Sequence, residues 1–175
     1  MRIIFLKNDL IWLIYVDLQQ KIAQLHQERK YRPVGVFLLC NSENECLIYE
    51  STKNKGFWIF PQGGIDSDEK PQDSMYREMK EELGVSKEEL ENVVIGDKIE
   101  CLNRPIGRKN RDGFCKGKAY ILMRANYSGN NNFKLKKDEV SAVKWVDYST
   151  AKHLFSKLRP KKSELLTKYL TSTSL

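Results

Sequence analysis

The chain has 175 residues, of which 41% are hydrophobic and 30% are charged, and its formal net charge is +7. This length and balance are ordinary for a soluble globular domain built around one core. A zinc site and a histidine triad are not supported, because His26 and His153 lie outside every motif and the cysteines show no CxxC pair or zinc spacing. We expect reduced, mostly structural thiols at Cys40, Cys46, Cys101 and Cys115.

Residues 1–30 are an N-terminal extension for which we expect an amphipathic helix from about 9 to 28. Apolar residues repeat there at helical spacing, at Ile11, Ile14, Tyr15, Leu18, Ile22 and Leu25. Charged and polar residues at 7–9 leave an apolar run too short to span a bilayer, and no small-residue cleavage site follows. We therefore expect no transmembrane segment and a cytoplasmic chain. The helix would pack on the domain or make a partner or peripheral membrane contact.

Residues 31–175 form the second expected unit, in which strands and helices are mixed. Two apolar runs around the polar turn NSEN predict a β-hairpin within residues 31–51. Further strands are expected near 56–60, 92–101, 117–127 and 140–148. One or two helices follow at 149–170, with Pro160 starting the second. This mixture predicts an α/β sandwich with a mixed β-sheet between helices.

The most informative segment is residues 63–85, GGIDSDEKPQDSMYREMKEELGV. Glu78, Glu81 and Glu82 fall within one turn of a predicted helix, so their carboxylates share one face, whereas the apolar residues occupy another. Like charges four residues apart cost about 0.2–0.5 kcal/mol per pair. A hard divalent cation would offset this repulsion. The alternative is an ordinary solvated acidic face.

The sequence also predicts where this helix begins and ends. Pro71 is tolerated near a helix start, Ser67 or Asp68 could cap it, and Gly84 suits the left-handed residue that ends a helix. A glycine turn at Gly63 would let a backbone carbonyl approach a metal closely. The segment is therefore expected to be a loop, a helix and a stop, with carboxylates directed at one place.

The same 23 residues match the Nudix box at every specified position, and the chain therefore resembles a Nudix hydrolase. The matching residues are Gly63, Glu69, Arg77, Glu78, Met79, Glu81, Glu82, Gly84 and Val85. The resemblance implies a Nudix-type α/β/α sandwich. It also implies that Glu78, Glu81 and Glu82 hold Mg²⁺ or Mn²⁺, with the Gly63 carbonyl as a further ligand. Arg77 and Glu69 would form a structural ion pair that orients the glutamates.

The flanking sequence resembles one branch of that family. The segments YRPVGVFLLCN, FWIFPQGGID and MYREMKEELG are similar to bacterial RNA pyrophosphohydrolases and to the related dinucleoside polyphosphate hydrolases. By this analogy Glu139 is an additional metal ligand or general base, and Arg32, Lys116 and Lys118 contact substrate phosphates. The alternative for Glu139 and Arg32 is an ordinary surface position. The two lysines alternate about Gly117, so on a strand they would point to one face.

The expected reaction is removal of pyrophosphate from the 5′-triphosphate end of RNA. A water activated by metal and by Glu139 or Glu78 would attack a phosphoanhydride phosphorus. One alternative is cleavage of dinucleoside polyphosphates such as Ap4A, and a second is a nucleotide- or RNA-binding module without turnover. The related RNA enzymes carry an arginine in the segment that reads STKNKG here, where only Lys53 or Lys55 could replace it. A positive surface around an acidic centre suits either polyanion.

Overall fold

The structure is a computed structural model that describes residues 7–104 and 116–171, and it describes the side chains of the first helix from residue 16 onward. Cys115 and the side chains of Ile11, Ile14 and Tyr15 therefore lie outside the described part. The helices are α1 (Lys7–Glu28), α2 (Pro71–Leu83), α3 (Tyr148–Phe155) and α4 (Pro160–Thr171), with a 3₁₀ turn η1 (Lys87–Glu89). The strands are β1 (Tyr31–Cys40), β2 (Cys46–Ser51), β3 (Trp58–Ile59), β4 (Gln62–Gly64), β5 (Leu90–Asn103), β6 (Gly117–Tyr127) and β7 (Val140–Val146).

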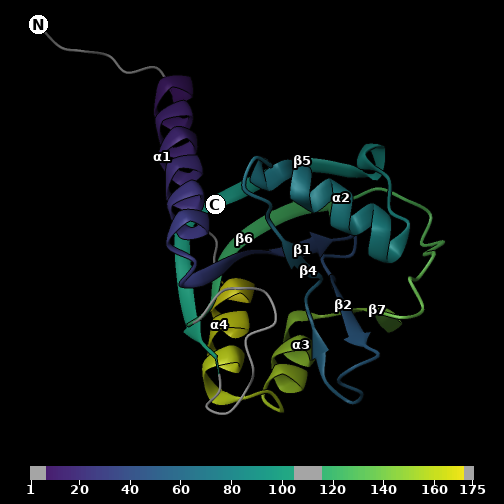
Figure 1. Cartoon of the computed structure of the whole chain (residues 1–175). Coiled ribbons are helices and arrows are strands. Elements are labelled where there is room, and N and C mark those ends of the chain that lie inside the picture. Colours follow the sequence, from purple (N-terminus) through teal and green to yellow (C-terminus); the bar gives the residue numbers. More distant parts are fainter. Residues whose placement is uncertain (1–6, 105–115, 172–175) are drawn as a thin grey trace, which may run out of the picture.

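The strands form one mixed sheet with helices on both faces (Figure 1). The strand order is β3-β2-β1-β6-β5, while β4 pairs with β1 and β7 pairs with β2. Strands β1 and β6 are parallel, and the remaining pairs are antiparallel. The expected α/β class with a mixed sheet is confirmed.

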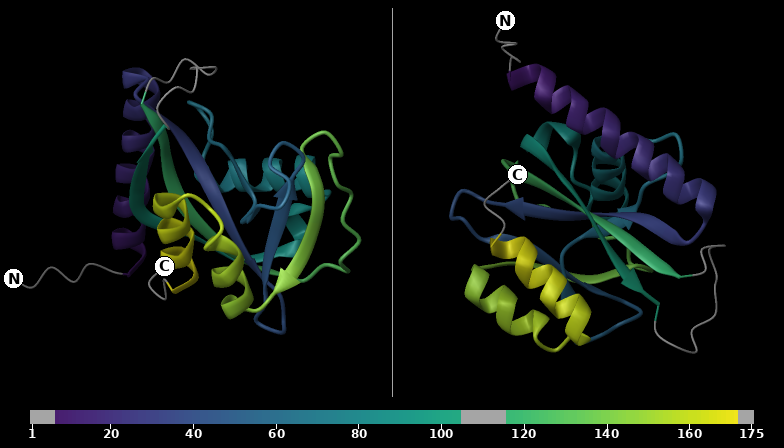
Figure 2. Two further views of the ribbon diagram at one scale, coloured as in Figure 1. Left: turned by 90° about the horizontal axis from the view of Figure 1, so that it is seen from below. Right: turned by 90° about the vertical axis from the view of Figure 1, so that its left-hand side faces the viewer.

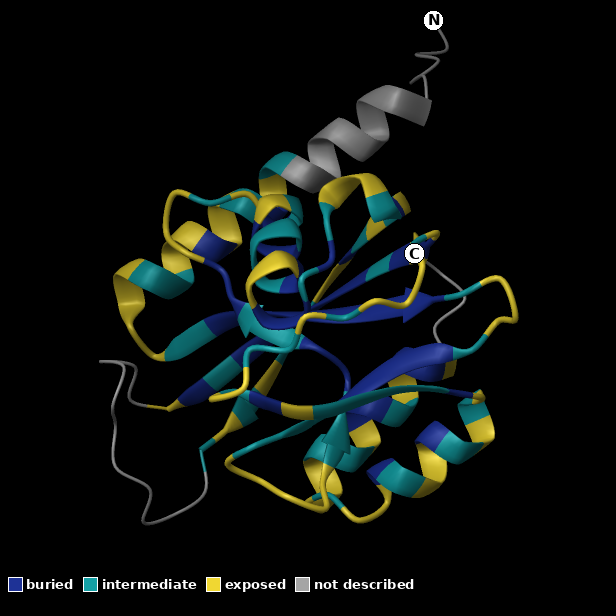
Figure 3. Ribbon diagram, turned by 90° about the vertical axis from the view of Figure 1, so that its right-hand side faces the viewer, coloured by how far each residue is buried: buried dark blue, intermediate teal, exposed yellow. Residues whose placement is uncertain are grey.

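Two apolar cores lie on opposite faces of this sheet, with α1 and α2 over one face and α3 and α4 over the other (Figure 2). Successive residues of β1 alternate between them, because side chains of a strand point to opposite faces. Phe37 and Leu39 enter the first core, whereas Val36 and Leu38 enter the second. The strand is buried along most of its length, as Figure 3 shows for the centre of the molecule.

Helix α1 packs on its own domain. Leu18 and Ile22 are 3% and 1% exposed and belong to the core that α2 shares, and His26 Nε2 lies 2.8 Å from the carbonyl oxygen of Ile65. The described residues give no support for the expected partner contact through this helix. In the described part of the chain, no helix is both long and apolar enough to cross a membrane.

Helix α2 carries the three glutamates and follows β4 closely. Pro71 is its first residue, and Gly84 ends it with φ 72°, donating its backbone N–H to Lys80. The expected cap by Ser67 or Asp68 is wrong, because the helix begins after Lys70 and no side chain caps it. Pro71 suits this first position because its φ is already helical and the N–H that it lacks would have no partner within the helix.

The glycines before the helix also differ from expectation. Gly63 and Gly64 do not lie in a loop but in β4, where they pair with Gly35 and Val34 of β1. This pairing fixes the entry to the helix against the central strand of the sheet. The position of the site is therefore set by the sheet as well as by the helix.

Candidate active site

Strands β1, β4 and β6, helix α2 and the turn before β7 line a small cavity of about 170 Å³. Its lining combines three carboxylates with two cations, and the residues are Arg32, Val34, Gln62, Gly63, Gly64, Glu78, Glu82, Lys118 and Glu139. The structure thus brings together most of the site residues expected from the sequence. Glu81 and Lys116 do not line this cavity.

The three glutamates of α2 have different surroundings. Glu82 is 6% exposed and Glu78 is half-buried, whereas the side chain of Glu81 is 51% exposed. Residues 78 and 82 are four apart and share the face that meets the sheet. Glu81 lies outside the cavity lining, and one of its carboxylate oxygens is 4.0 Å from Arg77.

Two glycines make room for charged side chains against β4. A Cβ atom added at Gly63 would overlap the carboxyl carbon of Glu78, and one added at Gly64 would lie 2.5 Å from Nη2 of Arg32. Only a residue without a side chain allows such close approach to the backbone. The carboxylate and the guanidinium therefore both rest directly on β4.

Arg77 holds this arrangement together through four hydrogen bonds. Its Nε and Nη2 donate to the two carboxylate oxygens of Glu69, each at 2.8 Å. Nη2 also donates to the Gly64 carbonyl at 2.9 Å, and Nη1 donates to Glu78 at 2.8 Å. A guanidinium suits this task because its donors have fixed planar geometry. The Glu69 carboxylate, followed by that of Glu78, raises the pKa of Arg77.

Glu82 is the buried centre of the carboxylate group. Its Oε2 is buried and has no hydrogen-bond partner among residues 7–104 and 116–171, while the side chain shares a hydrogen bond with Glu139. Burial, followed by the charges of Glu78 and Glu139, raises the pKa of Glu82 to about 8. Burial also raises the pKa of Glu78, although Arg77 opposes the shift.

Glu139 reaches the cavity from the segment before β7. Its backbone carbonyl accepts from the N–H of Thr52 at 2.9 Å, and its N–H donates to Lys136 at 2.9 Å. Lys136 in turn donates its backbone N–H to Glu82 at 2.9 Å, and its ammonium group lies 2.8 Å from Glu139 Oε1. These bonds tie the segment to α2 and to Thr52, the residue that follows β2.

The residues present fit a hard divalent cation. The donors are carboxylate and carbonyl oxygens, which such cations prefer, and an unpartnered buried oxygen stands among like charges. As placed, no three acidic side chains of the described residues converge at metal-binding distance. Glu78 and Glu139 are turned toward Arg77 and Lys136, so they would have to rotate to complete the ligand set.

The cations face the carboxylates from neighbouring strands. Arg32 and Lys118 are partners in the register of the parallel pair β1 and β6, and both line the cavity. Lys116 is exposed and precedes β6, which begins at Gly117, and its backbone N–H donates to Lys30. Lys118 therefore lies in β6 and lines the cavity, whereas Lys116 lies outside both.

Two residues of this region were missed by the sequence reasoning. Gln62 lines the cavity, and Lys162 of α4 donates to its side-chain oxygen at 2.9 Å. Gln62 belongs to the PQGG phrase and could have been named from it. Nothing distinguishes Lys162 in the sequence, because a hundred positions separate the two residues and other lysines surround it.

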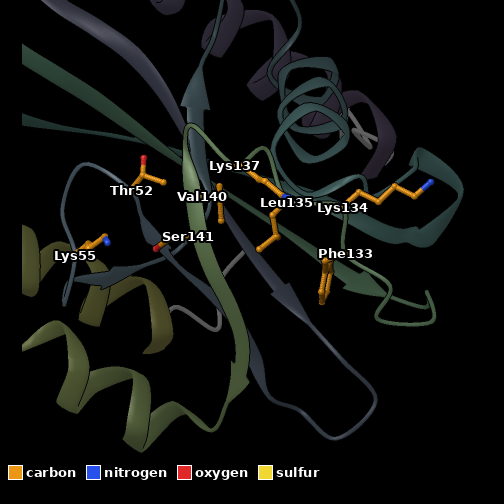
Figure 4. A pocket seen from close by; sticks show the side chains of 8 residues that line it. All are labelled: Thr52, Lys55, Phe133, Lys134, Leu135, Lys137, Val140 and Ser141. Carbon is orange, nitrogen blue, oxygen red and sulfur yellow. The ribbon is translucent and has the colours of Figure 1, made fainter.

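A second, larger hollow of about 700 Å³ lies beside the segment that carries Glu139 (Figure 4). It is lined by three lysines, two hydroxyl residues and three apolar residues, which are Lys55, Lys134, Lys137, Thr52, Ser141, Phe133, Leu135 and Val140. None of these lining residues is acidic. The same chain segment lines both hollows. Glu139 lines the smaller one, and its near neighbours Lys137 and Val140 line the larger one.

Comparison with known proteins identifies related sequences. A family model described as NUDIX domain matches residues 29–169. A protein named RNA pyrophosphohydrolase from Thioalkalivibrio sulfidiphilus is 32% identical over 126 residues, which cover 67% of this chain and 71% of that protein. In three further relatives of that name, the matched segments cover only 38%, 37% and 34% of the relatives' lengths.

Solved structures share the fold. The E. coli dihydroneopterin triphosphate pyrophosphohydrolase matches with a TM-score of 0.63 and 14% identity, over 81% of this chain and 97% of that one. A C. elegans Ap4A hydrolase binary complex matches with a TM-score of 0.57 and 20% identity, over 79% of this chain and 94% of that one. At these identities the likeness concerns the fold alone.

Proposed function

This chain belongs to the Nudix family and is a Nudix hydrolase, and from that premise we propose that it removes pyrophosphate from the 5′-triphosphate end of RNA. The observation that carries the proposal is the cavity in which Glu78, Glu82 and Glu139 face Arg32 and Lys118. Such a pairing suits a substrate with several adjacent phosphates, because cations hold the phosphates beside a group of carboxylates. The relative from Thioalkalivibrio sulfidiphilus bears the name of this activity.

Nudix hydrolases generally use divalent metal ions, and we propose Mg²⁺ or Mn²⁺ for this chain. Glu78, Glu82 and Glu139, which line the cavity, would hold it together with the Gly63 carbonyl, and Glu81 would join them by turning in from outside the lining. The cation would neutralise charge on the bridging phosphates and orient the attacking water. The buried, unpartnered oxygen of Glu82 supports this assignment.

Different residues of the chain bind the substrate, position Glu78 and accept the proton. Arg32 and Lys118 bind phosphate oxygens, and Arg77 holds Glu78 against β4. Glu139 or Glu78 takes a proton from the attacking water while the oxygen of that water bonds to the α-phosphorus. The bond to the leaving pyrophosphate breaks in the same displacement, and RNA with a 5′-monophosphate remains.

The second hollow supports RNA as the substrate. A transcript has a chain of phosphodiesters beyond its 5′ end, and Lys55 and Lys137 are exposed at a hollow next to Glu139. Lysines neutralise backbone phosphates without reading sequence. A dinucleoside polyphosphate ends after its second nucleoside and would have less need of these cations.

Purified protein can be assayed in parallel on 5′-triphosphate RNA and on Ap4A with Mg²⁺. The proposal expects the larger kcat/KM for RNA, with pyrophosphate and monophosphorylated RNA as products. A much larger kcat/KM for Ap4A would refute the RNA assignment in favour of a dinucleoside polyphosphate hydrolase. Binding of both substrates without turnover would instead indicate a nucleotide- or RNA-binding module.

A further inference from the structure

Lys162 does not line the cavity but contacts Gln62, a residue that does. It stands in the first turn of α4, where its Nζ donates to Gln62 Oε1 at 2.9 Å and lies 3.7 Å from the centroid of the Tyr120 ring. Gln62 belongs to β4 and lines the cavity beside Arg32 and Lys118. The C-terminal helix is thereby connected to the site through one side chain.

This contact holds the Gln62 amide with its oxygen toward Lys162. An ammonium group has only donors, so it can bond the amide oxygen but not the NH₂ group. The NH₂ group, on the other branch of the amide, is left to donate elsewhere. A flipped amide would present its oxygen to the cavity, where it would repel the oxygens of a phosphate.

The position is costly for a lysine that serves only packing. Burial, followed by the charges of Lys118 and Arg159, holds the pKa of Lys162 well below its usual value. This shift favours the neutral amine over the ammonium form. The negative charge of a polyphosphate in the cavity would favour the ammonium form of Lys162.

We infer that Lys162 is a positioning residue for substrate binding, which holds Gln62 so that its NH₂ group donates to a substrate phosphate and which adds positive charge behind Lys118. This inference rests on the proposed function, because it takes the cavity as the site of the polyphosphate. It assigns to α4 a part in binding that none of the sequence motifs indicates.

The test compares Lys162→Met with Lys161→Met, its exposed neighbour on the same helix. Both changes remove one lysine charge and keep side-chain length. We expect Lys162→Met to raise the KM for 5′-triphosphate RNA about tenfold, a factor that corresponds to about one lost charged hydrogen bond. We expect kcat to change by less than about threefold, and the melting temperature to stay the same or rise, because the change removes a half-buried amine whose charged form is disfavoured. Lys161→Met should match the wild type in all three values.

Two further variants separate binding from structure. Lys162→Arg keeps a cationic donor and should recover most of the lost affinity. Gln62→Glu keeps an acceptor for Lys162 but replaces the NH₂ group with an anion. It should therefore weaken binding of an α,β-imido analogue of the 5′-triphosphate RNA, in which the bond that releases pyrophosphate is not hydrolysed. An unchanged KM in Lys162→Met would overturn the inference. So would a lowered melting temperature with reduced kcat at unchanged KM, because that pattern indicates a structural lysine.

The proposed function is tested separately by the wild type. If the wild type hydrolyses Ap4A and leaves RNA unchanged, the RNA proposal fails, and the Lys162 comparison is then made on the KM for Ap4A. If the wild type binds the analogue without hydrolysing either substrate, the comparison is made on the dissociation constant of the analogue. Equal constants for wild type and Lys162→Met would again overturn the inference.

Discussion

Replacing Glu82 with glutamine should make the metal-free protein more stable while it removes the central carboxylate of the site. Glutamine has nearly the same shape but no charge. In the folded chain the carboxyl has a pKa of about 8, whereas its ordinary value is 4.5. Between these values the folded state holds a proton that the unfolded state has lost, so wild-type stability falls as the pH rises through this interval.

The size of the effect follows from these two values. At pH 7 the unfolded carboxyl is ionised and the folded one is still mostly protonated. The difference corresponds to about 3 kcal/mol of stability that Glu82→Gln would recover. For a chain of this size that is about 10 °C in melting temperature. At pH 5, close to the unfolded pKa, the gain shrinks to less than about 1 kcal/mol, or about 2 °C.

Thermal unfolding with a chelator at pH 5 and pH 7 measures this directly. Glu81→Gln is the matched control, because its half-exposed side chain should leave the melting temperature within about 1 °C of the wild type. Added Mg²⁺ should stabilise the wild type, since it binds the folded state, and should stabilise Glu82→Gln much less. A Glu82→Gln variant that is no more stable than the wild type at pH 7, or that gains equally at both pH values, would refute the reasoning.

Three other changes test the geometry of the site. Gly63→Ala places a Cβ atom where the Glu78 carboxyl lies, and it should lower kcat/KM by about a hundredfold or more with the circular dichroism unchanged; normal activity would contradict the close packing. Arg77→Lys replaces a four-bond guanidinium with a single ammonium group, so kcat should fall about tenfold or more, and a kcat equal to that of the wild type would show that Glu78 needs no such support. The double change Lys55→Met and Lys137→Met should raise the KM for RNA about tenfold and reduce its salt dependence while the KM for Ap4A stays constant; equal effects on both substrates would exclude the second hollow as an RNA path.

Local features of the sequence were enough to predict helix α2 and its position along the chain. The apolar stripe, Pro71 and Gly84 are short-range signals, and the structure has the helix where they predict it. The hairpin of β1 and β2 and the start of α4 at Pro160 were likewise readable from the sequence. The cap was not, because the position of Pro71 decides the helix start more strongly than an upstream polar side chain.

The arrangement of the site depended on contacts that no spacing encodes. Glu81 and Glu82 are adjacent in sequence, yet one is half-exposed and the other buried, because the seating of α2 on the sheet separates them. Lys116 precedes β6 and does not line the cavity, although it is only two residues from Lys118, which does. Lys162 reaches Gln62 only through the packing of α4 on the sheet.

The most direct test of the account is the rate at which wild type and Glu82→Gln convert 5′-triphosphate RNA to monophosphorylated RNA over a range of Mg²⁺ concentrations. We expect wild-type activity to require Mg²⁺ and to disappear with a chelator. Glu82→Gln should be slower by at least about a hundredfold at every Mg²⁺ concentration, although it is folded and more stable. Activity within a few fold of the wild type would contradict the claim that this buried carboxylate group is the catalytic metal site.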